Sequence, residues 1–116
     1  MTDFIFHITS RRCWTAAHKP GAYSTDSLKS EGFIHCSKID QIMRVANLFF
    51  TNQHDLVILE IDPSKLTPEV RWESGTDNDE EWFPHIYGPV NLEAVLRVVD
   101  FKPGPEGIFF LPAELK

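Results

Sequence analysis

The sequence has few cysteines, no cluster of basic residues and no long apolar run. Its only cysteines, Cys13 and Cys36, form no CxxC pair, which rules out a disulfide framework and the usual spacing of a structural zinc site. Acidic residues outnumber basic residues by 17 to 11, so the net charge is −6 at pH 7. General nucleic-acid binding is therefore disfavoured, because it depends on many basic side chains. Binding of a single phosphate or nucleotide is compatible with this charge.

The sequence also lacks the features of a secreted protein and of a membrane-spanning protein. The first residues, Met1-Thr2-Asp3-Phe4, carry neither the positive charge nor the apolar stretch of a signal peptide, and no apolar run approaches the roughly 20 residues that cross a bilayer. We therefore expect a cytoplasmic protein whose thiols are reduced. A length of 116 residues and a hydrophobic content of 42% predict one compact domain over residues 1–116, without linkers or repeats.

Short segments rich in aromatic and β-branched residues predict about six strands. They span residues 4–9, 33–36, 55–62, 70–73, 94–101 and 107–111. Two main helices are predicted, one over residues 10–18 and one that Ser37 caps and that continues to Phe50. Residues 20–32 and the acidic stretch 74–81 are expected to be loops. Because strands outnumber helices toward the C-terminus, the pattern indicates an α+β fold rather than a regular βαβ winding.

Three of the five histidines, His7, His35 and His85, lie inside apolar segments. Burial of an imidazole without a hydrogen-bond partner costs on the order of 1 to 3 kcal/mol, so each ring needs a partner or a role. Each taken alone is explained as a core histidine with a satisfied hydrogen bond. Together they favour convergence on one cleft, with His35 and His85 as an acid/base pair. Glu73 is the carboxylate best placed to pair with a histidine.

The residues after His7 have the pattern of an anion site. Thr9 and Ser10 precede the first predicted helix, and Arg11 and Arg12 lie in its first turn. Free backbone N–H groups and the helix dipole at such a start attract a phosphate or a carboxylate. Ordinary capping of the helix, with two solvated arginines, explains the same pattern.

Two further polar side chains are expected near the cleft. Ser37 follows His35 and begins the second predicted helix, which offers a second anion site. Tyr87 follows His85 in a segment held between two prolines, and its hydroxyl is expected at the cleft mouth. Cys36 is expected in the core, because adjacent residues of a strand point to opposite faces and it would not contact His35.

Two other functions fit the same residues. Three imidazoles leave an open coordination position for water on a metal ion, as in a metal-dependent hydrolase, although no HExxH or HxH spacing is present. Trp82 and Phe83 are aromatic side chains of the kind that anchor a protein partner, in which case the domain is noncatalytic.

Three segments, in this order, carry a resemblance to a known family. They are Phe6-His7-Ile8-Thr9, Glu31-Gly32-Phe33-Ile34-His35-Cys36-Ser37 and Phe83-Pro84-His85-Ile86-Tyr87-Gly88-Pro89-Val90-Asn91. The chain resembles a small bacterial family catalogued as domain of unknown function 952, and the likeness spans nearly all of it. The resemblance implies no chemistry, because that family is functionally uncharacterised.

A more distant resemblance is to the ADP-ribosyltransferase and RNA 2′-phosphotransferase superfold. Enzymes of that superfold carry a His-Gly-Thr motif on the first strand, where it binds the nicotinamide-nucleotide side of NAD, and His7-Ile8-Thr9 is similar with Ile8 in place of glycine. Their second strand carries Tyr or His before a helix with a small polar start, as His35 and Ser37 are placed here. Their catalytic glutamate has no clear counterpart in the C-terminal strands.

The predicted protein is therefore an α+β domain with an ADP-ribosyltransferase-like fold and a histidine-lined cleft. Its predicted ligand is a nucleotide or phosphorylated small molecule, and the resemblance implies NAD or an ADP-ribose derivative. Binding of this ligand is the leading prediction, and its transfer or hydrolysis is the further activity that the residues allow. His35 and His85 are the predicted catalytic residues. The predicted ligand contacts are His7, Thr9, Ser10, Arg11, Ser37 and Tyr87.

Overall fold

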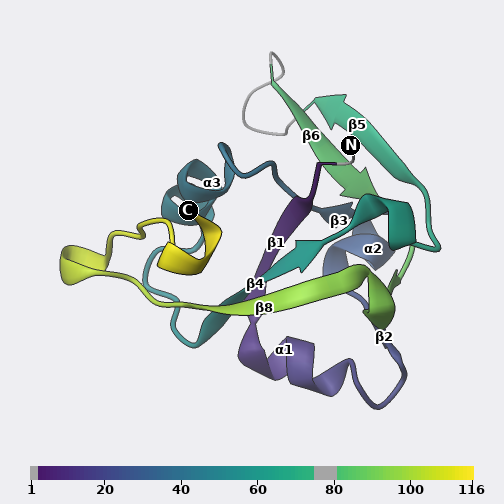
Figure 1. Cartoon of the computed structure of the whole chain (residues 1–116), viewed down its shortest axis with the longest axis horizontal. Helices are drawn as coiled ribbons and strands as arrows, with labels where there is room; N and C mark the ends of the chain where they lie inside the picture. Colours follow the sequence, from purple (N-terminus) through teal and green to yellow (C-terminus); the bar gives the residue numbers. More distant parts are fainter. Residues whose placement is uncertain (1–2, 75–80) are drawn as a thin grey trace.

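Antiparallel strands predominate over short helices in the computed structural model, which describes residues 3–74 and 81–116 (Figure 1). The strands are β1 Ile5–Ser10, β2 Ala22–Tyr23, β3 Ile34–His35, β4 Leu56–Ile61, β5 Val70–Ser74, β6 Trp82–Ile86, β7 Val90–Asn91 and β8 Val95–Phe101. The α-helices are α1 Arg11–Ala16, α2 Asp26–Ser30 and α3 Ile42–Phe49. Single 3-10 turns lie at Pro63–Lys65, Leu92–Ala94, Pro105–Gly107 and Ala113–Leu115. The predicted α+β class is confirmed.

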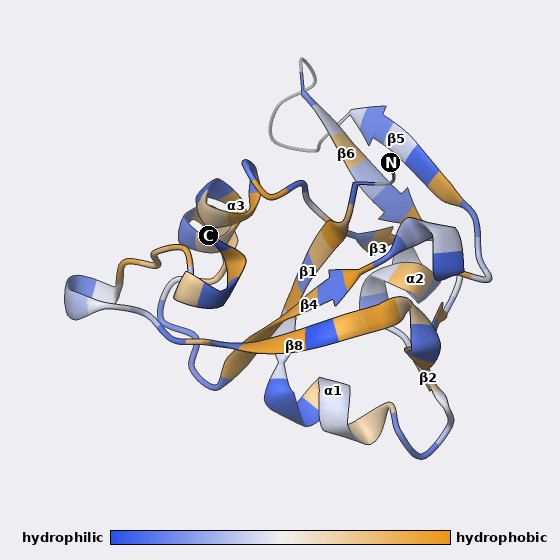
Figure 2. Ribbon diagram, viewed as in Figure 1, coloured by the Kyte–Doolittle hydropathy of each residue, from blue (hydrophilic) through white to orange (hydrophobic). Residues whose placement is uncertain are grey.

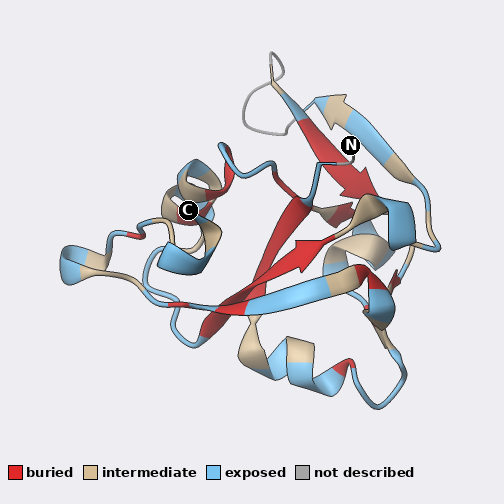
Figure 3. Ribbon diagram, viewed as in Figure 1, coloured by how far each residue is buried: buried red, intermediate tan, exposed pale blue. Residues whose placement is uncertain are grey.

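The central sheet has the order β1-β4-β8, and every residue of its middle strand, β4, is buried. Alternate side chains of a strand point to opposite faces, so β4 supplies two cores. Val57 and Leu59 pack on one face, while Leu56 and Ile58 pack on the other with residues of α3. β1 and β4 are orange over much of their length in Figure 2 and are mostly red in Figure 3, whereas most of β8 is exposed. Burial on both faces explains why apolar residues predominate in β1 and β4 without a regular alternation with polar ones.

A second sheet, β3-β6-β5, joins the central one edge to edge. The N–H of Phe6 donates to the carbonyl of Ser37, and the N–H of Ser37 donates to the carbonyl of Phe6, both at 2.8 Å. Within the second sheet, His35 of β3 lies opposite His85 of β6. The join therefore places the strand that carries His35 beside the strand that carries His7.

The prediction of a strand over residues 107–111 is wrong. Gly107 ends a 3-10 turn, and the chain after it pairs with no strand. The backbone of Phe109 is bonded instead to one side chain, because its N–H donates to Asn47 Oδ1 at 2.8 Å and its carbonyl accepts from Asn47 Nδ2 at 3.2 Å. A side-chain amide on α3 thus takes the place of a strand partner, while Phe109 buries its ring against Phe101.

The predicted cap at Ser37 is also wrong, since α3 begins at Ile42. Ser37 belongs to the join between the sheets, and the turn that follows it is held by Gln41. The side chain of Gln41 is buried, accepts from the N–H of Lys38 at 2.8 Å and donates to the carbonyl of Trp82 at 2.9 Å. This amide links the start of α3 to the start of β6.

The first predicted helix is present but short. Ser10 caps α1 by accepting from the N–H of Cys13 at 3.1 Å, as the pattern predicts, and the helix ends at Ala16 rather than at residue 18. The pairing of β2 with β7 is not predicted by the sequence. The predicted acidic loop falls mostly on residues 75–80, outside the described residues. No helix in the described part of the chain is long and apolar enough to cross a membrane.

Asn47 gives a direct test of how the C-terminal segment is held. We expect Asn47→Ala to lower the free energy of unfolding by about 1 to 3 kcal/mol, because it leaves the N–H and the carbonyl of Phe109 without these partners. Asn47→Asp keeps the acceptor for the N–H and should lose less. Urea unfolding curves of the three proteins check this order, and equal stability of wild type and Asn47→Ala would contradict it.

Candidate functional site

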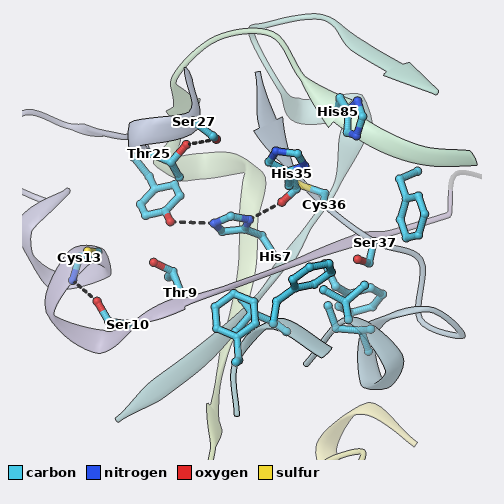
Figure 4. Close-up of a pocket in the computed structure, with 18 of the residues that line it drawn as sticks. His7, Thr9, Ser10, Cys13, Thr25, Ser27, His35, Cys36, Ser37 and His85 are labelled. Carbon is cyan, nitrogen blue, oxygen red and sulfur yellow. Dashed lines mark hydrogen bonds between the residues drawn. The ribbon is translucent and has the colours of Figure 1, made fainter. Parts of the chain in front are cut away.

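A pocket of about 540 Å³ lies where the two sheets join, between α3 and the segment that contains α2 (Figure 4). Its volume is within the range of small-molecule sites. The apolar and aromatic lining is Phe6, Ile8, Ile42, Val45, Phe49, Phe50 and Phe83. The remaining lining residues are His7, Thr9, Ser10, Cys13, Tyr23, Thr25, Ser27, Glu31, His35, Cys36, Ser37, Gln53 and His85. Apolar walls with a few polar groups between them are typical of ligand pockets.

All three histidines predicted to converge line this pocket. They come from β1, β3 and β6, and the rings of His35 and His85 meet edge to face with their centroids 5.3 Å apart. Their surroundings differ, because His7 and His85 are buried while His35 is half-exposed. The three rings therefore have to be assigned separate roles.

His7 is held at both ring nitrogens. A carbonyl only accepts, so Nδ1 carries the hydrogen and donates to the carbonyl of His35 at 2.6 Å. Nε2 is then an acceptor, and the hydroxyl of Tyr23 donates to it at 2.7 Å. Burial is the main cause that lowers the pKa of His7 to about 4, and burial also raises the pKa of Tyr23. Near neutral pH, His7 is thus an uncharged ring that positions β1, β3 and β2.

His85 is almost fully buried and is paired with Glu73 of β5. Its Nδ1 lies 2.9 Å from Oε1 of Glu73, and the hydroxyl of Tyr87 donates to the same oxygen at 2.5 Å. Both bonds lower the pKa of the Glu73 carboxyl, and the bond from Tyr87 has the larger effect. The ring of Phe33 stacks on His85 with the centroids 4.1 Å apart. The predicted pairing of Glu73 with a histidine is present in the structure.

His35 lies nearer to solvent and has its own carboxylate. Its Nε2 is 2.9 Å from Oε2 of Glu31, and both side chains are about two-fifths exposed, at 42% and 43%. Glu31 also lines the pocket. Two histidines of the pocket are thus each paired with a glutamate. His35 pairs with Glu31, which also lines the pocket, and the buried His85 pairs with the partly exposed Glu73, which lies outside the lining.

The structure brings some of the predicted ligand contacts to the pocket and not others. Thr9, Ser10 and Ser37 line it, although the hydroxyl of Ser10 is already engaged as the cap of α1. Arg11 does not line it, because its guanidinium pairs with Asp55 at 3.0 Å and with Asp100. The expected anion site at the start of α1 therefore lacks its arginine.

Tyr87 also lies outside the pocket lining and acts through Glu73, behind His85. Sequence reasoning did not place Tyr23, Thr25 or Ser27 in the site. They precede or begin α2 in a stretch rich in small polar residues, and no spacing rule separates such residues from an ordinary loop. Cys36 is buried as predicted, and burial raises the pKa of its thiol.

The lining described here includes no lysine or arginine. Several arginines are paired with carboxylates elsewhere, as Arg97 is with Glu60 at 3.0 Å and Arg71 with Glu69 at 3.1 Å. Within residues 3–74 and 81–116, no three His, Cys, Asp or Glu side chains are grouped so that they could hold a metal ion. His7 could ligate a metal only by losing a bond it already has, so this arrangement does not support a three-histidine metal site.

Comparison with known proteins places this fold and pocket in a family. A family described as Protein of unknown function (DUF952) matches residues 8–98. The chain belongs to this family. The match includes β3, β5 and β6, which carry His35, Glu73 and His85, and the first resemblance stated from the sequence is confirmed. No curated protein gives a significant match.

Solved structures similar to this DUF952 protein come from Caulobacter crescentus. The X-ray crystal structure of protein CC0527 is 30% identical, covers 97% of each chain and superposes with a TM-score of 0.85. The solution NMR structure of CC0527 is 30% identical, covers 90% of each chain and has a TM-score of 0.77. The fold of this DUF952 protein is therefore similar to that of CC0527 as solved by crystallography and by NMR.

The buried neutral state of His7 predicts a pH dependence of stability. Its pKa of about 4 in the folded protein lies below the ordinary 6.5, so the unfolded chain binds the extra proton between these values. The stabilisation is complete above pH 6.5 and is lost as the pH falls toward 4, with a total on the order of 3 kcal/mol. Urea unfolding at several pH values measures it.

His7→Gln should be less stable than wild type near pH 7. Its free energy of unfolding should not show the decrease between pH 6.5 and pH 4 that the protonation of His7 causes. His54→Gln is the matched control, because His54 is exposed. If wild type and His7→Gln lost stability in parallel between pH 6.5 and pH 4.5, the assignment of a buried neutral His7 would be wrong.

Proposed function

We propose that the pocket binds a nucleotide or phosphorylated small molecule, with NAD or an ADP-ribose derivative as the leading class, and that His35 and His85 perform acid/base chemistry on it. The observation that carries this proposal is that two histidines that line one pocket of small-molecule size are each bonded to a glutamate. Such pairs hold an imidazole in a fixed orientation, which proton transfer requires.

The lining supports a definite orientation for such a ligand. The aromatic side chains of Phe6, Phe49 and Phe83 suit a flat ring, and the hydroxyls of Thr25 and Ser37 suit ribose oxygens. Because no lysine or arginine is among the lining residues, a buried phosphate would find only imidazoles as counter-charges. We therefore place the ring and ribose inside the pocket and the phosphates toward its open side, near His35.

The distant resemblance to the ADP-ribosyltransferase and RNA 2′-phosphotransferase superfold supports the same ligand class. His7 corresponds to the histidine that these enzymes carry on their first strand, but both of its ring nitrogens are hydrogen-bonded within the protein. Its part in the proposal is therefore to shape the pocket. The carboxylates of Glu31 and Glu73 take the place of the glutamate for which the C-terminal strands offer no counterpart.

One observation supports the alternative that this domain is noncatalytic and binds a protein partner. Trp82 is 59% exposed, whereas Phe83 beside it is buried and lines the pocket. An exposed indole suits a protein partner. Trp82→Ala therefore separates the two functions. The variant should bind small molecules as wild type does, and it should bind a protein partner more weakly if the domain has one.

Thermal unfolding in the presence of ADP-ribose, NAD, a phosphorylated sugar or zinc tests the proposal. A ligand at 100 times its dissociation constant adds roughly 2.7 kcal/mol to the stability, so the first three compounds should raise the melting temperature. Stabilisation by zinc alone, with no response to any phosphorylated compound, would contradict the proposal and favour a metal site.

His85→Asn tests the role of the buried pair. An amide N–H can still donate to Glu73, so the variant should fold, while the affinity for ADP-ribose, or the turnover of a substrate, should fall at least roughly tenfold. His54→Asn is the exposed control. Calorimetric titrations at matched folded fraction decide it, and equal affinity in wild type and His85→Asn would remove His85 from the site.

A further inference from the structure

Glu73 of β5 connects the side chains of His85 and Tyr87. In the β5–β6 hairpin, Arg71 lies opposite His85 and Glu73 lies opposite Phe83, so all four residues share one face. One oxygen of Glu73 meets both Nδ1 of His85 and the hydroxyl of Tyr87. The carboxylate is thus fixed between the pocket and the outside of the sheet.

The charge state of Glu73 determines which nitrogen of His85 carries the hydrogen. An ionised carboxylate only accepts, and the bonds from Tyr87 and His85 favour its ionised form. Nδ1 of His85 is therefore the donor. In the neutral ring, Nε2 then carries a lone pair, so it is an acceptor and a base.

Nε2 of His85 has no partner among the described residues. Every side-chain nitrogen or oxygen atom that is buried in these residues has a hydrogen-bond partner. A side-chain nitrogen without a partner, such as Nε2 of His85, is therefore accessible to solvent. His85 is only 3% exposed and lines the pocket, and the accessible side of its ring therefore faces the cavity. A nearly buried imidazole with one nitrogen fixed and the other open to a pocket is a site that is built for a ligand.

We propose that Glu73, held in place by Tyr87, is a positioning residue that fixes His85 as a hydrogen-bond acceptor for a hydroxyl group of the ligand. The identity of that ligand rests on the function proposed above, whereas the state of the ring does not. Ribose hydroxyls of a nucleotide are groups of the required kind. An anionic oxygen is not, because it cannot donate to Nε2.

The same contacts prepare His85 to take a proton. When a bound hydroxyl loses its proton to Nε2, the O–H electron pair stays on the oxygen, the N–H bond forms and the ring becomes positively charged. Nδ1–H remains bonded to Glu73, whose negative charge stabilises that cation. No oxidant, metal ion or second reactant takes part in this step.

Other charged groups around His85 leave Glu73 as its direct partner. The guanidinium of Arg71 lies 4.3 Å from the centre of the Tyr87 ring and is paired with Glu69. On the β3 side, the ring of His35 meets His85 edge to face, and its Nε2 is bonded to Glu31. Glu73 is the carboxylate bonded to His85 itself.

The hydroxyls of Tyr23 and Tyr87 provide a matched comparison, because each is linked to a histidine that lines the pocket. Tyr23 donates directly to Nε2 of His7, whereas Tyr87 donates to the carboxylate that holds His85. Removal of either hydroxyl is the same chemical change, Tyr→Phe. Only Tyr87→Phe should affect the contact between Glu73 and His85.

Nitrogen NMR of the imidazole rings at a pH where they are neutral tests the proposal without any ligand. In wild type, His85 should show a protonated Nδ1 and an unprotonated Nε2. Glu73→Gln should convert this pattern to a mixture of the two tautomers, because the amide of glutamine can donate as well as accept. Tyr87→Phe should move the pKa of Glu73 upward, toward its ordinary value, and Tyr23→Phe should leave His85 unchanged.

A wild-type His85 that carries its hydrogen on Nε2, or an unchanged tautomer in Glu73→Gln, would overturn the proposal. Titration with ADP-ribose separates this result from the proposed function. Absence of ADP-ribose binding while the wild-type and Glu73→Gln tautomers are as expected would reject that ligand class and support the positioning role. Binding of ADP-ribose together with an unchanged tautomer in Glu73→Gln would support the pocket's function and reject the role of Glu73.

Discussion

The pair of backbone hydrogen bonds between Phe6 and Ser37 is the contact on which the site depends. It joins the edge of the central sheet to the segment just after β3, and so sets how far the carbonyl of His35 lies from the ring of His7. Neither sheet alone forms the pocket, because β1 lines one side of it and β3 and β6 line another. These two hydrogen bonds thus bring His7 close to His35 and His85, which the pairing of β3 with β6 places opposite each other.

Burial of polar groups at this join is tolerated because the side-chain atoms that are shut off from solvent are bonded. No buried side-chain nitrogen or oxygen of the described residues lacks a partner. His7 has a donor and an acceptor, and Gln41 uses both ends of its amide between Lys38 and Trp82. A satisfied network of this kind specifies one arrangement of the chain, since any shift leaves a buried group unpaired.

How well the sequence predicted each part depended on how local its cause was. β1 and β4 were predictable because burial on both faces leaves a run in which apolar residues predominate, and the shared pocket was predictable because histidines inside such runs need partners. β6 was not predicted as a strand, because Pro84 lies within it. The false strand at 107–111 and the position of Arg11 depend on Asn47, Asp55 and Asp100, which are distant in sequence and follow no spacing rule.

The distribution of charge explains why the imidazoles are the chemically important groups of the pocket. Arg11 and Arg97 pair with carboxylates on the central sheet, and Arg44 pairs with Glu81 beside the start of β6. These guanidiniums stabilise the frame around the pocket and do not line it. Among the described lining residues, positive charge can therefore come only from rings that gain a proton, and burial keeps His7 neutral. In the function proposed above, recognition and proton transfer therefore fall to His35 and His85, each of which has a carboxylate bonded to it that would stabilise the protonated ring.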